Sequence, residues 1–372
     1  MSRIKSKIGR LIPFRLKLFL RFLQRFYRFV FQRNKLQVYD GGGYINDEIK
    51  SSIDRIIIES PKVDDIDIKE LERDIILCYL FYGFTPLDFY LFNFHKENSS
   101  WKSRRTFVSD VYKDYKLFWK EGADSYLELY DKYKFYEKTN RYFNREVMFV
   151  NEHTKESDFI EFAMRVRNLF IKSNSDSYGR GAFATMVNTE TDAKKLFEKV
   201  RNKSYIVEER LHQKPEMGKW NDSSLNTVRV NTYLTNKGFY VLAPFMRTGR
   251  KGSIVDNGGA GGVFASIDVV SGEIITNGFD EFGTCYPLHP DSRVPYKGEK
   301  IPEWKSLLNL AEQIHSKCMS NHIYIGWDFA YTERGWTLVE GNWGQFICQQ
   351  TSTKRGFKPN FDCYMRGNAI NK

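Results

Sequence analysis

The pattern of hydrophobic and polar positions changes near residue 150. Residues 50–130 show helix-like, aromatic-rich periodicity, whereas the later chain has short apolar runs separated by turn residues, which predict strands. Helical periodicity returns at 156–170, 190–202 and 302–320. The pattern therefore predicts a mainly helical N-terminal region followed by an α+β body.

A separate amphipathic helix is predicted for residues 14–33, directly after Pro13. One narrow stripe is polar and basic, and consists of Lys17, Arg21, Gln24, Arg25, Arg28 and Gln32. The opposite side is apolar, and consists of Leu16, Phe19, Leu20, Leu23, Phe26, Tyr27 and Val30. This pattern is typical of helices that lie in the headgroup layer of an anionic membrane. The alternative is a helix that packs its apolar side on the protein body.

Positive charge is concentrated in the same segment. The chain has 57 Lys and Arg against 46 Asp and Glu, and residues 1–39 hold eleven basic side chains and no acid, so the remainder is balanced. A balanced body disfavours nucleic acid as a partner. No uncharged apolar run reaches the roughly 18 residues of a membrane span, and the five scattered cysteines suit the reducing cytoplasm. We expect a cytoplasmic protein, bound peripherally at the inner face of the membrane.

Two segments could hold a nucleotide. The apolar run 169–172 ends in Lys172, and the loop after it contains Ser173, Gly179 and Gly181, small residues that let backbone N–H groups approach phosphates. The order of residues is not that of a Walker loop. In the second segment an apolar strand runs into Glu208 and Glu209, where edge backbone could pair an adenine; the alternative is an ordinary strand end.

A hairpin is predicted from the strands 226–232 and 239–247. If residues 236–238 form a three-residue loop, Thr235 pairs with Phe239 and Arg229 lies opposite Phe245. Arg247 then lies one diagonal step from Arg229, on the same face. Two guanidinium groups on one face repel unless an anion lies between them. The sequence thus predicts an anion site, provided that the loop length is right.

A second hairpin, from strands 323–331 and 336–342, predicts a metal site. A loop of residues 333–335 pairs Thr332 with Trp336 and places Asp328 opposite Glu340, with Asn342 on the same face. Two facing carboxylates destabilise a sheet unless a cation bridges them. The oxygen-only ligand set suits Mg²⁺ that is bound together with substrate phosphates. The alternative is a pair of solvated acids at a sheet edge.

Together these segments resemble the ATP-grasp superfamily, and within it the sugar-transfer-associated ATP-grasp family of polysaccharide gene clusters. The resemblance covers roughly residues 130–345 and is carried by the stretches RNLFIKSNSDSYGRGAF, YIVEERLHQ, SLNTVRVNTYL, FMRTGRKGSIVDNGGAGGV and IGWDFAYTERGWTLVEGNWG. Ser173 stands where the family commonly has proline.

The resemblance implies roles for individual residues. The Mg²⁺ ligands fall on Asp328, Glu340 and Asn342, and the lysines that contact ATP fall on Lys172 and, in the stretch YDKYKFYEKTN, on Lys132. The hinge that pairs adenine falls on Glu208, Glu209 and Leu211, beside the phosphate loop with Ser173, Gly179 and Gly181. Arg229 would stabilise the transferring phosphoryl group, and Arg247 would be a second anion contact.

The resemblance also implies a fold and an activity. We expect a basic amphipathic helix at 1–38, a helical region at 39–130, and two α+β subdomains at 131–215 and 216–372 that clasp ATP. The implied enzyme is an ADP-forming ligase that uses ATP and Mg²⁺ to join a carboxylate and an amine through an acyl phosphate. It would attach an amino acid or amine to a cell-envelope polysaccharide or its precursor. The alternatives are a ligase of a soluble peptide or metabolite, and a non-catalytic membrane-associated scaffold.

Overall fold

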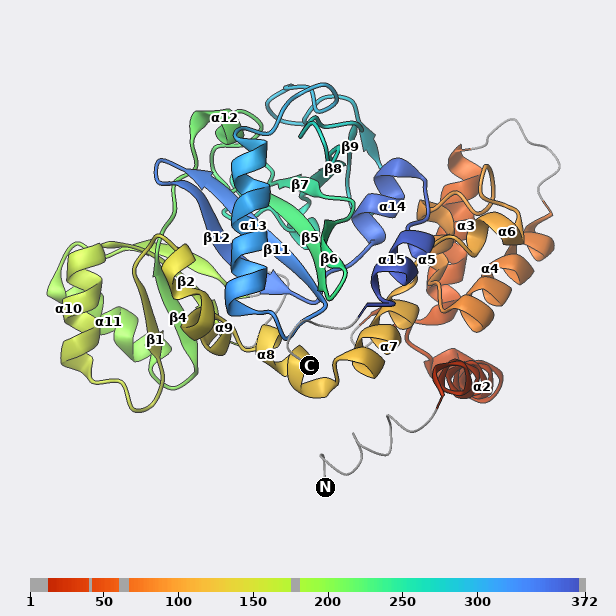
Figure 1. Ribbon diagram of the computed structural model, residues 1–372, viewed down its shortest axis with the longest axis horizontal. Coiled ribbons are helices and arrows are strands. Elements are labelled where there is room, and N and C mark those ends of the chain that lie inside the picture. Colours follow the sequence, from red (N-terminus) through yellow and green to blue (C-terminus); the bar gives the residue numbers. More distant parts are fainter. Residues whose placement is uncertain (1–12, 40–41, 60–66, 175–180, 368–372) are drawn as a thin grey trace. The chain divides into compact units, whose positions relative to one another are not determined.

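The computed structural model describes residues 13–39, 42–59, 67–174 and 181–367. The chain divides into two units, residues 1–123 with 345–368 and residues 124–344 with 369–372 (Figure 1). The first unit thus ends near residue 123, where we expected a boundary at 130. It also takes up the segment 345–368, which we expected in the last subdomain.

The first unit is helical in its described part, which confirms the predicted helical N-terminal region. Its elements are α2 (Phe14–Gln32), η1 (Arg33–Lys35), α3 (Ile45–Glu59), α4 (Ile68–Tyr82), α5 (Pro86–Leu91), α6 (Trp101–Arg104), α7 (Asp110–Lys120), α14 (Ile347–Thr353) and α15 (Lys358–Tyr364). Aromatic side chains such as Phe84, Phe89 and Phe94 fill its core. None of the helices in the described ranges is long and apolar enough to cross a membrane.

Helix α2 contacts the rest of the first unit through one edge. The Phe22 ring stacks on Phe81 with centroids 5.0 Å apart, and the Arg25 guanidinium donates two hydrogen bonds to the carbonyl of Leu80. The predicted apolar side is exposed instead: Leu16, Phe19, Leu20, Leu23, Phe26, Tyr27, Val30 and the adjacent Phe31 are each 42–69% accessible. The alternative in which the helix packs this side on the body is therefore wrong.

The second unit begins with α8 (Ala123–Tyr130), α9 (Lys132–Thr139) and η2 (Asn140–Tyr142), which lead into a four-stranded antiparallel sheet. The strands are β1 (Val147–Val150), β2 (Asn168–Ser173), β3 (Phe183–Met186) and β4 (Tyr205–Glu209), in the order β1-β4-β2-β3. Helices α10 (Glu156–Val166) and α11 (Glu190–Val200) pack on one face of this sheet, as Figure 1 shows. Lys172 in β2 and Glu208 in β4, which are described below, belong to this sheet.

A larger antiparallel sheet follows after α12 (Pro215–Gly218). It has the order β10-β9-β8-β7-β5-β11-β12, with β6 paired to β5. Its elements are β5 (Thr227–Thr235), β6 (Gly238–Val241), β7 (Phe245–Thr248), η3 (Gly258–Ala260), β8 (Val263–Ser266), β9 (Gly278–Phe279), β10 (Cys285–Tyr286), α13 (Trp304–Cys318), β11 (Tyr324–Thr332) and β12 (Gly335–Asn342). Helix α13 crosses one face of the central strands (Figure 1) and buries Val230, Ile325 and Trp327. Side chains that alternate with these lie on the opposite face.

Candidate active site

The opposite face of the large sheet collects the polar residues that the two hairpins predict. Asp328 in β11 lies between two partners in register, Arg229 in β5 and Glu340 in β12. Asn342 lies beside Glu340, two residues further along β12, and is paired with Gly326. Phe245 in β7 is the register partner of Arg229, and Arg247 is two residues beyond it. The predicted order of residues across the sheet is therefore confirmed.

Both predicted loop lengths are wrong. Thr332 pairs with Gly335 rather than Trp336, and Thr235 pairs with Gly238 rather than Phe239, so each hairpin has a two-residue loop. One extra residue further along the same strand pair restores the register. In β12 the irregularity lies next to Asp328, and in the other hairpin it falls between β6 and β7. A β-bulge shifts the pairing by one residue. In each hairpin the extra residue therefore compensates for the shorter loop, and the pairing at the site is the predicted one.

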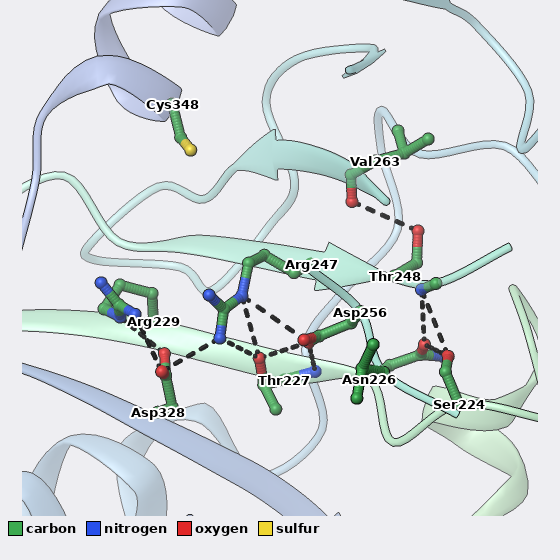
Figure 2. A network of polar contacts seen from close by, with 12 residues as sticks. Ser224, Asn226, Thr227, Arg229, Arg247, Thr248, Asp256, Val263, Asp328 and Cys348 are labelled. Carbon is green, nitrogen blue, oxygen red and sulfur yellow. Dashed lines mark hydrogen bonds and ion pairs between the residues drawn. The ribbon is translucent and has the colours of Figure 1, made fainter. Parts of the chain in front are cut away.

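Asp328 is the anion that separates the two arginines (Figure 2). The Arg229 Nε and Nη2 atoms donate to its Oδ1 and Oδ2 at 2.5 and 2.8 Å, and the Arg247 Nη2 atom lies 3.0 Å from Oδ2. Burial would raise the pKa of Asp328, but the charges of Arg229 and Arg247 outweigh it and lower the pKa. Asp328 is thus ionised, and the three side chains together carry one net positive charge.

Asp256 holds Arg247 from the other side, and sequence reasoning did not single it out. Its Oδ2 accepts hydrogen bonds from the Thr227 backbone N–H and hydroxyl at 2.9 and 2.5 Å, and lies 3.6 Å from Arg247 Nε (Figure 2). The Thr227 hydroxyl also accepts from Arg247. The only signal in the sequence was the position of Asp256 before the glycine-rich stretch.

The three residues predicted to bind a metal are brought together. The Asn342 Nδ2 atom donates to Asp328 Oδ2 at 3.2 Å and to Glu340 Oε1 at 3.3 Å. Burial, followed by the charge of Asp328, raises the pKa of Glu340. In the described part of the chain, no group of three or more Asp, Glu, His or Cys side chains is arranged so that it could hold a metal ion by itself. Two carboxylates and an amide oxygen nevertheless fit Mg²⁺, which commonly takes its other ligands from water and substrate phosphates.

Two side chains of the four-stranded sheet, Lys172 and Glu208, lie next to Glu340 of the predicted metal site. Lys172 at the end of β2 lies with its Nζ atom 2.5 Å from Glu208 Oε1 in β4. Glu208 is buried, and although burial alone would raise its pKa, the neighbouring Arg145 and Lys172 lower it. Lys132, Lys172, Glu208 and Glu340 line one cavity of about 10 Å³, which is the space of a single water molecule. Residues predicted for ATP and for the metal therefore share one cavity.

Arg145 links the two sheets, and sequence reasoning missed it. Its Nε atom donates to Glu208 Oε2 at 2.7 Å, and its Nη1 and Nη2 atoms donate to the carbonyls of Leu338 and Val339 at 2.7 and 3.4 Å. These carbonyls belong to the irregular part of β12, directly before Glu340. Arg145 lies two residues before Val147, the register partner of Glu208. The pairing of β1 with β4, which brings Arg145 to Glu208, cannot be predicted from the sequence pattern.

The other predicted ATP contacts lie apart from this cavity. Glu209 forms an ion pair with Arg334 at 2.8 Å, and Leu211 follows the end of β4 as a half-buried side chain. Ser173 ends β2, and Gly181, with φ of +71°, closes the loop in open space. Gly179 lies outside the described residues. Their roles toward ATP stay predictions.

Comparisons with known proteins point to one family. A family model described as sugar-transfer associated ATP-grasp matches residues 123–362, more than half of the chain. No curated protein matches the chain.

Solved structures with a similar fold are ligases and synthetases. D-alanyl-alanine synthetase A from Vibrio cholerae is 12% identical, with a TM-score of 0.42 and 68% of each chain covered. D-alanine–D-alanine ligase from Bacillus anthracis is 10% identical, with a TM-score of 0.39, and the match covers 67% of this chain and 69% of that one. The ATP-grasp ligase PsnB in complex with a precursor variant, Mg and ADP is 10% identical, with a TM-score of 0.39 and coverages of 74% and 72%.

Proposed function

The chain belongs to the sugar-transfer-associated ATP-grasp family, and from this premise we propose that it attaches an amino acid or amine to a cell-envelope polysaccharide or its precursor. Membership confirms the predicted family and the ATP-grasp fold. The chain is accordingly an ADP-forming ligase that uses ATP and Mg²⁺ to form carbon–nitrogen bonds. The polysaccharide substrate is the part that we propose.

The observation that carries the mechanism is the arrangement of charge across the two sheets. Glu340, Asp328 and Arg229 lie on neighbouring strands β12, β11 and β5, in that order, and Lys172 with Lys132 lines the cavity next to Glu340. A nucleotide that enters at the lysines would point its phosphates along this row. Phosphoryl transfer depends chiefly on positioning and on neutralised charge, which this row supplies.

The residues that would hold Mg²⁺ are Asp328, Glu340 and Asn342. Asp328 Oδ1 accepts a hydrogen bond from Arg229 Nε, whereas Oδ2 accepts from Arg229, Arg247 and Asn342, so Oδ1 retains lone-pair capacity. When bound, Mg²⁺ would neutralise negative charge on the phosphate oxygens. Asp328 and Glu340 would offer two carboxylates to a cation at this position.

The remaining residues would act on the substrates. Lys172 and Lys132 would bind the phosphates of ATP, and Arg229 and Arg247, with one net positive charge beside Asp328, would hold the phosphoryl group during transfer. The substrate carboxylate would attack the γ-phosphorus and expel ADP, which leaves an acyl phosphate. The amine would then attack the acyl carbon, and inorganic phosphate would leave as the C–N bond forms.

We place this chemistry at the inner membrane surface. The exposed apolar side of α2, with accessible Arg15, Arg21 and Arg28 on the same helix, supports binding to an anionic bilayer. Precursors of cell-envelope polysaccharides are carried on membrane lipids, so an enzyme anchored there would meet them.

Hydroxylamine tests the proposed reaction without knowledge of the natural amine. The protein with MgATP and a panel of uronic acids, amino acids and sugar nucleotides should form a hydroxamate and release equal amounts of ADP and phosphate with at least one carboxylate. Release of AMP and pyrophosphate would contradict the acyl-phosphate mechanism. Turnover with peptides alone would reject the polysaccharide substrate and keep the ligase.

A further inference from the structure

The first turn of α9 is hydrogen-bonded to Asn174, the residue that directly follows β2. The Asn174 carbonyl accepts a hydrogen bond from the Lys132 backbone N–H at 3.4 Å, and its side-chain Oδ1 atom accepts from the Tyr133 backbone N–H at 2.9 Å. The Asn174 Nδ2 atom donates to Oδ1 of Asp131, the N-cap residue of α9, at 3.1 Å. Three hydrogen bonds therefore join the start of the helix to the residue two positions beyond Lys172.

These bonds go beyond the capping of α9. Asp131 already caps the helix, because its Oδ1 atom accepts from the backbone N–H groups of Tyr133 and Lys134, both at 3.1 Å. In α11 the cap is formed by the start of the helix itself: Thr189 accepts from the Asp192 N–H, and Asp192 accepts from the Thr189 N–H. The additional contact with Asn174 fixes α9 relative to β2.

The residue held in this way carries one of the predicted ATP lysines. Lys132 is the first residue of α9 and lines the same cavity as Lys172 and Glu340. Its side chain has a flexible four-carbon stem, so the position of its ammonium group depends on where its backbone is held. The bond from the Lys132 N–H to the Asn174 carbonyl holds that backbone beside the end of β2, and thereby sets the spacing of the two lysines.

Further along, α9 contacts the predicted metal site. Phe135 is 2% exposed and packs against the backbone of Gly341, which lies between Glu340 and Asn342 in β12. A Cβ atom at Gly341 would lie 2.5 Å from Cε2 of this ring, so the close approach requires glycine. Helix α9 therefore contacts both sheets of the second unit, the end of β2 through Asn174 and β12 through Phe135.

We propose that Asn174 is a positioning residue for ATP binding, which holds α9 so that Lys132 lies beside Lys172 and contacts the phosphates of the same nucleotide. Asn174 acts through Lys132 and makes no contact of its own with the nucleotide. Phosphoryl transfer depends on such positioning, because a displaced cation neutralises less of the phosphate charge. This inference rests on the proposed function, in which both lysines bind the phosphates of ATP.

The test is a double-mutant cycle of Asn174→Ala and Lys132→Met in the full chain, measured as the Kd of a non-hydrolysable ATP analogue with Mg²⁺. We expect Asn174→Ala to weaken binding at least fivefold and Lys132→Met to weaken it at least tenfold. The double variant should bind less than twofold more weakly than Lys132→Met, because Asn174 has no effect once its lysine is gone. All three variants should fold, since Asp131 still caps α9.

The matched control is Thr189→Ala, which removes the cap of a helix whose first turn does not line the cavity. This variant should lower the melting temperature at least as much as Asn174→Ala does and leave the Kd of the analogue unchanged. Equal weakening of nucleotide binding by Thr189→Ala would show that any loss of stability has this effect, and would overturn the proposal.

Two further results would overturn it. One is an unchanged Kd for Asn174→Ala. The other is a further fivefold loss when Asn174→Ala is added to Lys132→Met, which would show that Asn174 acts independently of Lys132. The measurement needs no carboxylate, so it is separate from the test of the proposed function. If Lys132→Met binds the analogue as tightly as the parent, the inference fails, whereas ADP release with a carboxylate would still support the ligase.

Discussion

At the scale of residues, the two carboxylates of the site are not equivalent. The sequence predicts a symmetrical pair of repelling acids, but Asp328 contacts Arg229 and Arg247, whereas Glu340 contacts Asn342 and faces Asp328. Burial and Asp328 raise the pKa of Glu340, while the arginines lower that of Asp328. Removing one acid should therefore affect stability differently from removing the other.

The first prediction concerns this difference. Asp328→Asn and Glu340→Gln should both reduce ATP turnover at least a hundredfold. Asp328→Asn should also lower the free energy of unfolding by about 3 kcal/mol, because it leaves the buried guanidinium group of Arg229 without its counter-charge. Glu340→Gln should unfold at or above the denaturant midpoint of the parent, because it removes repulsion. Full activity of Glu340→Gln, or equal stability of the two variants, would contradict the assignment.

The second prediction concerns pH. Because Arg145 and Lys172 lower the pKa of Glu208 below its ordinary value of 4.5, ionised Glu208 stabilises the fold above about pH 4.5. This contribution is lost as the pH falls through the lower folded-state pKa. Glu208→Gln should therefore show a shallower loss of unfolding free energy than the parent between pH 5 and pH 3 in denaturant titrations. Parallel curves for the two proteins would count against the ion pairs.

At the scale of elements, irregular strands set the site. Each hairpin has a loop one residue shorter than predicted and an extra residue further along, and Arg145 binds the carbonyls at the irregular part of β12. A bulge leaves backbone groups without ladder partners, and a buried guanidinium can satisfy several of them. Arg145 therefore helps to hold Glu340 opposite Asp328.

The third prediction follows for Arg145. Arg145→Met should lower the free energy of unfolding by about 3 kcal/mol, since it leaves Glu208 with one cation fewer, and should reduce ATP turnover at least tenfold through the displaced Glu340. The matched control is Arg165→Met, which removes an exposed arginine paired with Glu146 and should change either quantity little. An Arg145→Met protein with normal turnover would show that the β12 register does not depend on Arg145.

The fourth prediction concerns α2. Replacing the exposed Phe19, Leu23 and Phe26 together by Gln should weaken binding to anionic phospholipid vesicles at least tenfold and leave the melting temperature unchanged. Binding of the parent should weaken as salt rises. The control is Phe22→Ala, which removes the stack on Phe81 and should lower the melting temperature while vesicle binding persists. Unfolding of the triple variant, or unaltered sedimentation with vesicles, would reject the membrane surface.

At the scale of the whole molecule, the cavity between the two sheets of the second unit is too small for a nucleotide. Lys132, Lys172, Glu208 and Glu340 enclose space for one water molecule. Their side chains come from α9, β2, β4 and β12. A nucleotide bound at these lysines would require the elements around the cavity to separate.

The fifth prediction is a change in hydrogen exchange on nucleotide binding. Mg²⁺ with a non-hydrolysable ATP analogue should alter exchange in α9, β4 and β12 and leave α4 of the first unit unchanged. Lys172→Met should weaken the effect, because it removes a phosphate contact. Tight binding without any change in these three elements would show that the nucleotide uses another site.

The sequence by itself determined the family, the helical N-terminal region and the sheet face that Arg229, Asp328 and Glu340 share. Local patterns suffice for these, because the alternation of side chains along a strand assigns Arg229, Asp328 and Glu340 to faces, and the stripe on α2 follows from helical periodicity alone. The sequence did not determine the lengths of the two hairpin loops. A two-residue loop followed by a bulge and a three-residue loop without a bulge give the same pairing at the site, and the sequence does not show which of the two forms.

Only the tertiary structure decided which charges meet. Asp328 contacts Arg229 across 99 positions of sequence and Arg145 meets Glu208 across 63, and such pairs depend on sheet order rather than on any local pattern. It also decided that α2 packs through Phe22 and Arg25 and exposes its apolar side, because the surface that a helix buries is set by the shape of its neighbour.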